Sequence, residues 1–371
     1  MPSDQGKPVL HPYADLPGTA FWRSAVSGRD PMAITGLWAP KFAITPNDGV
    51  ATFGSCFAQH FGRALRARGY RWLTPEAPPR KLPTDLGRDF GYGQFSARTG
   101  NIYTPTLLLQ WLRWAFGVEQ MPRDHWPDGA RFRDPYRPRL EPEGFETVAE
   151  LRRLRRVTLK ALRDSVLKAR VFVFTLGLTE RWVDLETGLE YPLCPGTVAG
   201  IYDPARHVFA PLDYSQALDG MAQALDLMRA QNPDLRFLLT VSPVPLAATA
   251  SGAHVLTATT ASKAILRAVA GALADSRADT DYFPSFEIIT SPVFGGRFHA
   301  PDQRQVTREG VRFVMDSFFA DMATQFPDAA ASPDPDSPDR PGTEAHPVMP
   351  DTPAEDVVCE EELLAAFGPR P

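Results

Sequence analysis

The chain has 371 residues, of which 43% are hydrophobic, and a net charge of −5 at pH 7. This length and composition can fill a sizeable core in one large or two smaller domains, and the acidic balance argues against a nucleic-acid or anionic-membrane partner. Its cysteines, Cys56, Cys194 and Cys359, are an odd and widely spaced set. They lack the close pairs of a zinc site or a disulfide framework, so we expect free thiols and no bound metal.

The sequence also shows no hydrophobic segment that is typical of membrane spans or export signals. The start of the chain carries no apolar stretch of signal-peptide length, and no segment approaches about 18 consecutive apolar residues. We therefore expect no membrane span and a cytoplasmic location.

Hydrophobic periodicity predicts strands that alternate with helices along most of the chain. In chain order we expect an irregular extension over 1–46, a strand over 49–54, helices over 56–69, 104–117 and 151–170, a strand over 169–177, a helix over 214–233, a strand over 235–243, a helix over 260–276, a strand over 282–290 and a helix over 308–326. This alternation predicts an α/β fold with a mainly parallel sheet covered on both faces. Ligands of such sheets bind beyond the carboxyl ends of the strands, where residues 54–60, 175–182 and 240–246 fall.

Two charged or polar segments have ordinary structural interpretations. The basic run over 151–170 keeps its apolar residues at helical spacing, so we interpret it as the solvated face of an amphipathic helix rather than a binding patch. The proline- and aspartate-rich stretch over 327–355 has no apolar period and should be disordered. Residues 356–371 could form a short amphipathic docking segment, with a frayed terminus as the alternative.

The most informative stretch is Gly54-Ser55-Cys56, where the first predicted strand meets the first predicted helix. Unpaired N–H groups and the positive end of the helix dipole gather at such a corner, where they favour a thiolate and can stabilise an oxyanion. His60 follows Cys56 by four residues and shares its helix face, as a base beside a nucleophile would. The alternative is a buried cysteine that packs against neighbouring phenylalanines.

Several blocks of the sequence resemble the GSCFA family. They are "FGSCFAQHFGRAL" (53–65), "RTGNIYTPTLLLQWL" (98–112), "TLGLTERW" (175–182), "TVSPVPLAAT" (240–249), "HVLTATTASKAILR" (254–267) and "DYFPSFEII" (281–289). The family is similar to the SGNH hydrolases, so the resemblance implies a flavodoxin-like three-layer α/β/α sandwich over residues 47–326. It also implies ester hydrolysis or O-acyl transfer, and a link to bacterial surface polysaccharides.

The resemblance carries roles onto particular residues. Against the Gly-Asp-Ser block of SGNH hydrolases, Cys56 stands at the nucleophile position and Ser55 at the aspartate position; a shift of one residue would make Ser55 the nucleophile. Glu180 replaces the aspartate of the Gly-x-Asn-Asp block, where it would orient a histidine or pair with an arginine. Oxyanion or substrate-binding roles fall on Gly54, Gly100, Asn101, Gly177 and Thr179.

The resemblance breaks at the catalytic base. SGNH hydrolases carry Asp-x-x-His near the end of the domain, and here Asp302 is present but Gln305 replaces the histidine. Glutamine cannot accept a proton at neutral pH, although a thiol depends less on an adjacent base than a hydroxyl does. His60, His254 or His299 could replace the base, and each could instead be an ordinary core, helix-start or loop residue.

Two cations could bind an anionic group of a substrate: Lys263, whose alternative is a solvated lysine, and Arg304, beside Gln305. We expect an esterase or O-acyltransferase that acts on ester-linked acyl groups of a carbohydrate or glycoconjugate through a covalent acyl-enzyme. Hydrolysis would need no cofactor, whereas transfer would need acyl-CoA or a similar donor. The alternative is a non-catalytic, pseudoenzyme-like module that binds glycans. The sequence leaves the oligomeric state open.

Overall fold

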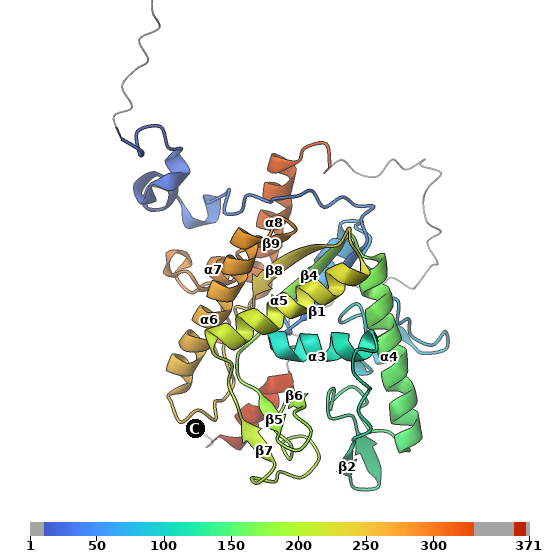
Figure 1. Cartoon of the computed structure of the whole chain (residues 1–371). Coiled ribbons are helices and arrows are strands. Elements are labelled where there is room, and N and C mark those ends of the chain that lie inside the picture. The colour runs from blue at the N-terminus through green and yellow to red at the C-terminus, as the bar shows by residue number, and fades with distance from the viewer. Residues whose placement is uncertain (1–10, 330–359, 369–371) are drawn as a thin grey trace, which may run out of the picture.

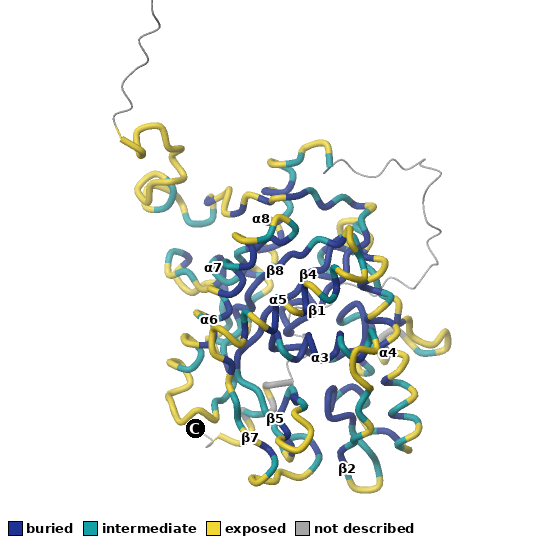
Figure 2. Tube along the Cα trace, in the orientation of Figure 1, coloured by how far each residue is buried: buried dark blue, intermediate teal, exposed yellow. Residues whose placement is uncertain are grey.

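A four-stranded parallel sheet forms the centre of the protein (Figure 1). The computed structural model describes residues 11–329 and 360–368. The strands are, in sheet order, β1 (Val50–Gly54), β4 (Val171–Leu176), β8 (Arg236–Val241) and β9 (Thr280–Tyr282). Figure 2 shows that these strands are buried, as expected of a parallel sheet with helices on both faces.

Alternate residues of the strands pack on opposite helical layers. Phe172 and Phe174 of β4 contribute to one core cluster, whereas Val171 and Val173 contribute to the other. The first layer contains α3 (Pro105–Ala115), α4 (Val148–Lys168), α5 (Tyr214–Gln231) and α6 (Val255–Ser276), and the second contains α1 (Ala58–Ala67), α7 (Ser285–Thr290) and α8 (Arg308–Gln325). The chain is therefore a three-layer α/β/α sandwich, which confirms the predicted fold class.

Side-chain caps determine where several helices begin. Thr104, Thr147 and Thr307 cap α3, α4 and α8, and Asp213 opens α5 with a capping box. The ring nitrogen Nδ1 of His254 accepts a backbone N–H at the start of α6. This helix therefore begins earlier than its predicted start at residue 260.

Two further predictions about these elements were wrong. The strand predicted over 282–290 is mostly helical, because β9 ends at Tyr282 and α7 begins at Ser285, directly after Pro284. Proline has no N–H to donate to a strand ladder, but it is tolerated where a helix starts. The helix predicted over 56–69 begins only at Ala58, so Ser55 and Cys56 lie in the turn before it.

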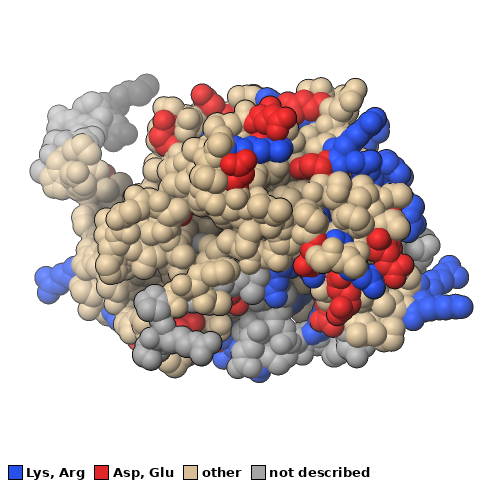
Figure 3. All heavy atoms as spheres, turned by 90° about the horizontal axis from the view of Figure 1, so that it is seen from below, with Lys and Arg blue, Asp and Glu red and all other residues tan. Residues whose placement is uncertain are grey.

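Several short elements were not predicted from the sequence. They are α2 (Thr84–Asp89), the hairpin of β2 (Trp126–Asp128) and β3 (Arg131–Arg133), the antiparallel sheet of β5 (Trp182–Asp184), β6 (Glu190–Tyr191) and β7 (His207–Phe209), and η4 (Pro292–Phe294). In Figure 1, β5, β6 and β7 lie below the central sheet, on the side that its carboxyl ends face. Seen from that side, acidic and basic side chains are interspersed, and much of the remaining surface is uncharged (Figure 3).

The two ends of the described chain contain only short helical turns. Residues 11–46 form η1 (Gly18–Ala20), η2 (Arg23–Ser27) and η3 (Pro31–Ala33) before Trp38 and Phe42 join the core. Near the other end lies η6 (Glu360–Phe367). The tail predicted to be disordered falls mainly on residues 330–359, which lie outside the described residues. Within the described part of the chain, no helix has the length and apolar character needed to cross a membrane.

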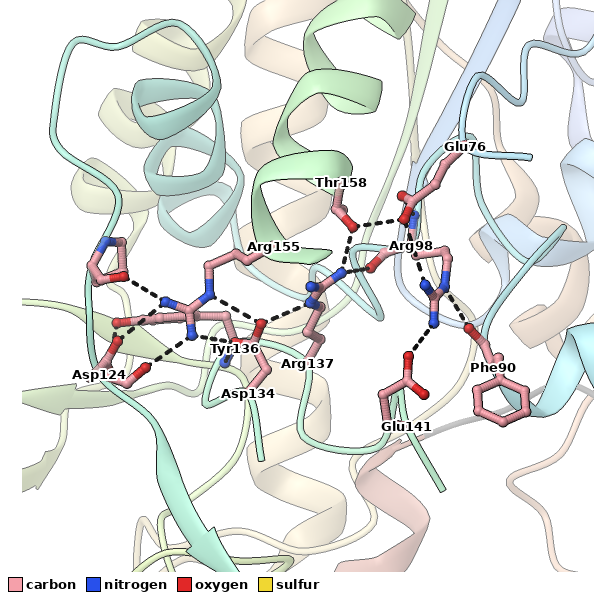
Figure 4. Close-up of polar contacts among 11 residues, drawn as sticks. Glu76, Phe90, Arg98, Asp124, Asp134, Tyr136, Arg137, Glu141, Arg155 and Thr158 are labelled. Carbon is pink, nitrogen blue, oxygen red and sulfur yellow. Dashed lines mark hydrogen bonds and ion pairs between the residues drawn. The ribbon is translucent and has the colours of Figure 1, made fainter. Parts of the chain in front are cut away.

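A buried network of charged side chains fixes the segment around residue 134 to α4 (Figure 4). Asp134 accepts hydrogen bonds from Arg137 Nε at 2.8 Å and from Arg155 Nε and Nη2 at 3.1 and 2.9 Å. All three side chains are fully buried. Arg137 also donates to the Thr158 hydroxyl, which donates to Glu76 at 3.0 Å. The basic helix predicted over 151–170 thus has one arginine in the core, although its other face is solvated.

Candidate functional site

The corner after β1 is set by a close approach of two strands. Gly54 has φ +128°, and a Cβ at this position would lie 2.6 Å from Thr175 N and closer still to Thr175 O. Only glycine fits here, because both the conformation and the space exclude a side chain. The Ser55 N–H then donates to Thr175 O at 3.0 Å, so the chain leaves β1 while still bonded to β4.

Ser55 and Cys56 form the turn between β1 and α1. The Ser55 carbonyl accepts the Ala58 N–H at 2.9 Å, and the Cys56 carbonyl accepts the Gln59 N–H at 3.1 Å. Both residues are buried, and the Ser55 hydroxyl has no hydrogen-bond partner among the described residues. A buried hydroxyl without a partner costs free energy and calls for an explanation, of which a reactive role is one.

The loop before α3 passes next to this corner. Gly100 has φ +67° and Asn101 is buried. The Ile102 N–H donates to Gly54 O at 2.9 Å, and Tyr103 O accepts the Gly177 N–H at 2.9 Å. The loop therefore joins the ends of β1 and β4 and places Gly100 and Asn101 directly before the residue that bonds to Gly54.

Gly177 and its neighbours complete the same edge. A Cβ at Gly177 would lie 3.0 Å from Ser55 Cβ and 3.0 Å from Tyr103 Cδ1, so the glycine allows close packing against the corner. Lys263 Nζ donates to the Gly177 carbonyl at 2.5 Å, and the Thr179 N–H donates to Ser262 Oγ at 2.9 Å. Lys263 is buried. The alternative of a solvated lysine is thus wrong, and Lys263 brings its amino group to the end of β4.

The three candidate histidines have different environments. His60 is buried with its ring edge-on to Phe57, and burial, together with the charge of Arg63, lowers its pKa to about 3. Such an imidazole stays neutral at physiological pH and is a weak base. His254 is exposed and is occupied as the cap of α6. This arrangement disfavours His60 and His254 as bases.

His299 is half-buried and lies beside Asp302. Burial lowers the pKa of His299, and the nearby charge of Asp302 opposes that shift. Asp302 Oδ1 also accepts the backbone N–H groups of Arg304 and Gln305, each at 3.0 Å. Asp302 therefore holds the loop in shape and also favours the charged form of His299. The side chain of Gln305 in the same loop is exposed.

Glu180 and Arg304 both bind the segment that follows β8. Thr249 Oγ1 donates to Glu180 Oε1 at 2.5 Å, and burial raises the pKa of Glu180 although the Thr249 hydroxyl and the Ala250 N–H oppose the rise. Among the described residues Glu180 thus pairs with a hydroxyl and an amide rather than with the expected arginine or histidine. Arg304 Nε donates to Pro245 O at 3.2 Å.

Sequence reasoning missed two contributors. Tyr103 accepts two backbone N–H groups at the end of β4, from Gly177 and Leu178, and Thr249 binds Glu180. Both residues lie within blocks that resemble the family, but each acts through a contact between loops far apart in the sequence. Only the order of the strands brings those loops together.

The second described cysteine provides a reference for Cys56. Burial raises the pKa of Cys194 to about 11. Because only the thiolate reacts with alkylating agents, about one Cys194 in a thousand should be reactive at pH 8. In a Cys56→Ser, Cys359→Ser variant we expect iodoacetamide labelling to accelerate about tenfold per pH unit up to about pH 11. A rate that levels off at about pH 8.5, as for a free thiol, would show that the Cys194 thiol is not buried as described.

These observations define a class of protein: an α/β/α sandwich with a serine–cysteine turn at the carboxyl edge of its sheet. The chain belongs to the GSCFA family, whose family model matches residues 49–318. No curated protein and no solved structure matches the chain.

Proposed function

We propose that this protein hydrolyses or transfers ester-linked acyl groups of a carbohydrate or glycoconjugate. The observation that carries the proposal is the turn after β1, where a thiol and an unpartnered hydroxyl adjoin at the edge where parallel sheets bind ligands. The resemblance of the Gly54–Cys56 block to that of the SGNH hydrolases supplies the reaction class, and the link of the GSCFA family to bacterial surface polysaccharides supplies the carbohydrate substrate.

In the proposed reaction Cys56 is the nucleophile. Its sulfur attacks the acyl carbonyl carbon, a C–S bond forms, the ester C–O bond breaks, and the alcohol leaves with the proton from the thiol. Water or a second hydroxyl then takes the acyl group and restores the thiol. The Cys56 N–H and the N–H groups of the Gly100 loop would hold the oxyanion, with the Thr179 side chain beside them. The N–H groups of Ser55 and Gly177 would instead fix the shape of the site, because they donate to Thr175 O and Tyr103 O.

His299 has the environment best suited to carry the proton. Burial lowers the pKa of His299, but the charge of Asp302 opposes that shift, whereas burial and Arg63 lower the pKa of His60 to about 3. Lys263 and Glu180 would tune the field at the end of β4. Hydrolysis by this route needs no cofactor, and transfer would take its acyl group from acyl-CoA or a similar donor.

Turnover of p-nitrophenyl acetate tests this proposal. We expect Cys56→Ala to lower kcat/KM by about 10³-fold or more, because the covalent route is lost, and Ser55→Ala to lower it less. If Ser55→Ala abolishes turnover and Cys56→Ala does not, the nucleophile is the serine. Equal turnover in wild type and both variants would contradict catalysis at this corner.

A second candidate function is a glycan-binding module without catalysis. Two observations favour it. Gln305, which stands where SGNH hydrolases carry the basic histidine, has an exposed side chain, and His60 is neutral because its pKa is lowered to about 3. Such a module would bind oligosaccharides with the same affinity in wild type and Cys56→Ala, and it would turn over no ester.

A further inference from the structure

The short helix η6 lies on the same side of the molecule as the candidate site. In Figure 1 it is the red segment below the central sheet, on the side where β5, β6 and β7 also lie. Because the carboxyl ends of the strands face this side, η6 comes close to the region where a substrate would enter. The contacts that hold η6 on this side of the molecule are side-chain contacts with a loop far away in the sequence.

An ion pair joins η6 to the loop after η4. Glu362 Oε1 lies 3.3 Å from Arg304 Nη1. Arg304 is held in place from two other directions, since its Nε donates to Pro245 O and its backbone N–H donates to Asp302 Oδ1. Glu362 thus meets a guanidinium group whose position is already fixed, and Leu364 adds a half-buried apolar side chain to the docked segment.

A short series of contacts connects this ion pair to the serine–cysteine turn. Pro245, which accepts the Arg304 hydrogen bond, precedes Leu246. Leu246 packs in one buried cluster with Tyr103 and Leu178. Tyr103 in turn adjoins Gly177, the residue that packs against Ser55. Arg304, the anchor of η6, is therefore bonded to the loop after β8, and that loop packs against residues next to the serine–cysteine turn.

We propose that Glu360–Phe367 is an intrachain cap of the candidate site. The Glu362 carboxylate binds Arg304 while the cap is docked, and its release uncovers the site. The proposal rests on the proposed function only for the identity of the site, and its test measures access rather than turnover.

The anchor is weak enough to open. The Glu362 side chain is 41% exposed and that of Arg304 15%, and ion pairs of this kind are screened by salt. We therefore expect the docked and released states to exchange, with loss of the pair shifting the ratio by about two- to fivefold.

The labelling rate of Cys56 in the full chain tests the cap. In a Cys194→Ser, Cys359→Ser background, Glu362→Gln should raise the iodoacetamide rate about two- to fivefold, and Glu362→Lys should raise it further through repulsion of Arg304. Raising NaCl from about 0.05 to 0.5 M should accelerate the wild-type background but not Glu362→Gln. The matched control is Glu119→Gln, because Glu119 is 43% exposed and pairs with Arg113 at 2.9 Å on the surface.

The outcomes distinguish a cap from an ion pair that covers nothing. The double variant Arg304→Glu, Glu362→Arg should restore the slow rate. Equal rates in the background and Glu362→Gln, or the same increase in Glu119→Gln, would overturn the proposal. Should Cys56 stay unlabelled throughout, hydrogen exchange of the amides of the serine–cysteine turn, residues 55–59, gives the same comparison and must be faster in Glu362→Gln. Because neither readout needs an ester substrate, a protein without esterase activity would still show whether η6 covers the site.

Discussion

Asp134→Ala should lower the free energy of unfolding by about 3–5 kcal/mol. The change leaves the guanidinium groups of Arg137 and Arg155 buried without the carboxylate that both bind. Taking a charge out of water is costly, and here one shared carboxylate offsets much of that cost for two charges. Urea unfolding followed by circular dichroism measures the loss.

Asp128→Ala is the matched control. Asp128 also binds an arginine, Arg133, at 2.8 Å, but its side chain is 39% exposed, so we expect a loss below about 1 kcal/mol. Similar losses in the two variants would contradict the importance of burial in this network.

The pH dependence of the Asp134 effect follows from its pKa. Burial alone would raise the pKa of Asp134, but the charges of Arg155 and Arg137 outweigh it and lower the pKa below its ordinary value of 3.8. A carboxyl with a depressed pKa contributes stability above its unfolded-state pKa and loses it as the pH falls through the folded-state value. The difference between wild type and Asp134→Ala should therefore be full at pH 7 and shrink below about pH 4.

Gly54→Ala should cost about 2–6 kcal/mol of folding free energy, the sum of a strained backbone and an overpacked contact. At φ +128° a side chain is disfavoured, and its Cβ would collide with the backbone of Thr175. Backbone atoms of a central strand cannot move aside, so β1 and β4 must separate and carry Ser55 out of place. Thermal and urea unfolding measure the loss.

Gly69→Ala separates the two contributions. Gly69 also has positive φ, +78°, but a Cβ there would meet nothing within 4 Å. We expect only the strain contribution, about 1–3 kcal/mol. If Gly54→Ala costs no more than Gly69→Ala, the close approach of β1 and β4 at the corner is wrongly described.

The layers of the fold could be predicted because their signals are local. The apolar runs over 49–54 and 169–177 form β1 and β4, and the amphipathic stretch over 214–233 forms α5. Residues 285–290 were predicted to be a strand because a short apolar run with β-branched residues has no distinctive period. The turn at Pro284, rather than the composition of the run, decides that it is helical.

The site could be predicted only in part. The serine–cysteine turn and Gly177 could be proposed as site residues, because each directly follows a predicted strand and ligands of parallel sheets bind beyond the strand ends. The burial of Lys263 could not be predicted, since its only signal is a lysine on a helix and its partner, the Gly177 carbonyl, lies 86 positions away. The low pKa of His60 likewise depends on packing that no local pattern encodes.

Location of a covalent acyl group tests the central proposal most directly. The full chain is mixed with p-nitrophenyl acetate, quenched in acid and mapped by peptide mass spectrometry, with Cys56→Ala and Ser55→Ala in parallel. We expect the acetyl group on Cys56, released by neutral hydroxylamine as a thioester is, absent in Cys56→Ala and retained in Ser55→Ala. An acetyl group on Ser55 would move the nucleophile by one residue. Acetylation of surface lysines alone, equal in all three proteins, would contradict an acyl-enzyme at this corner.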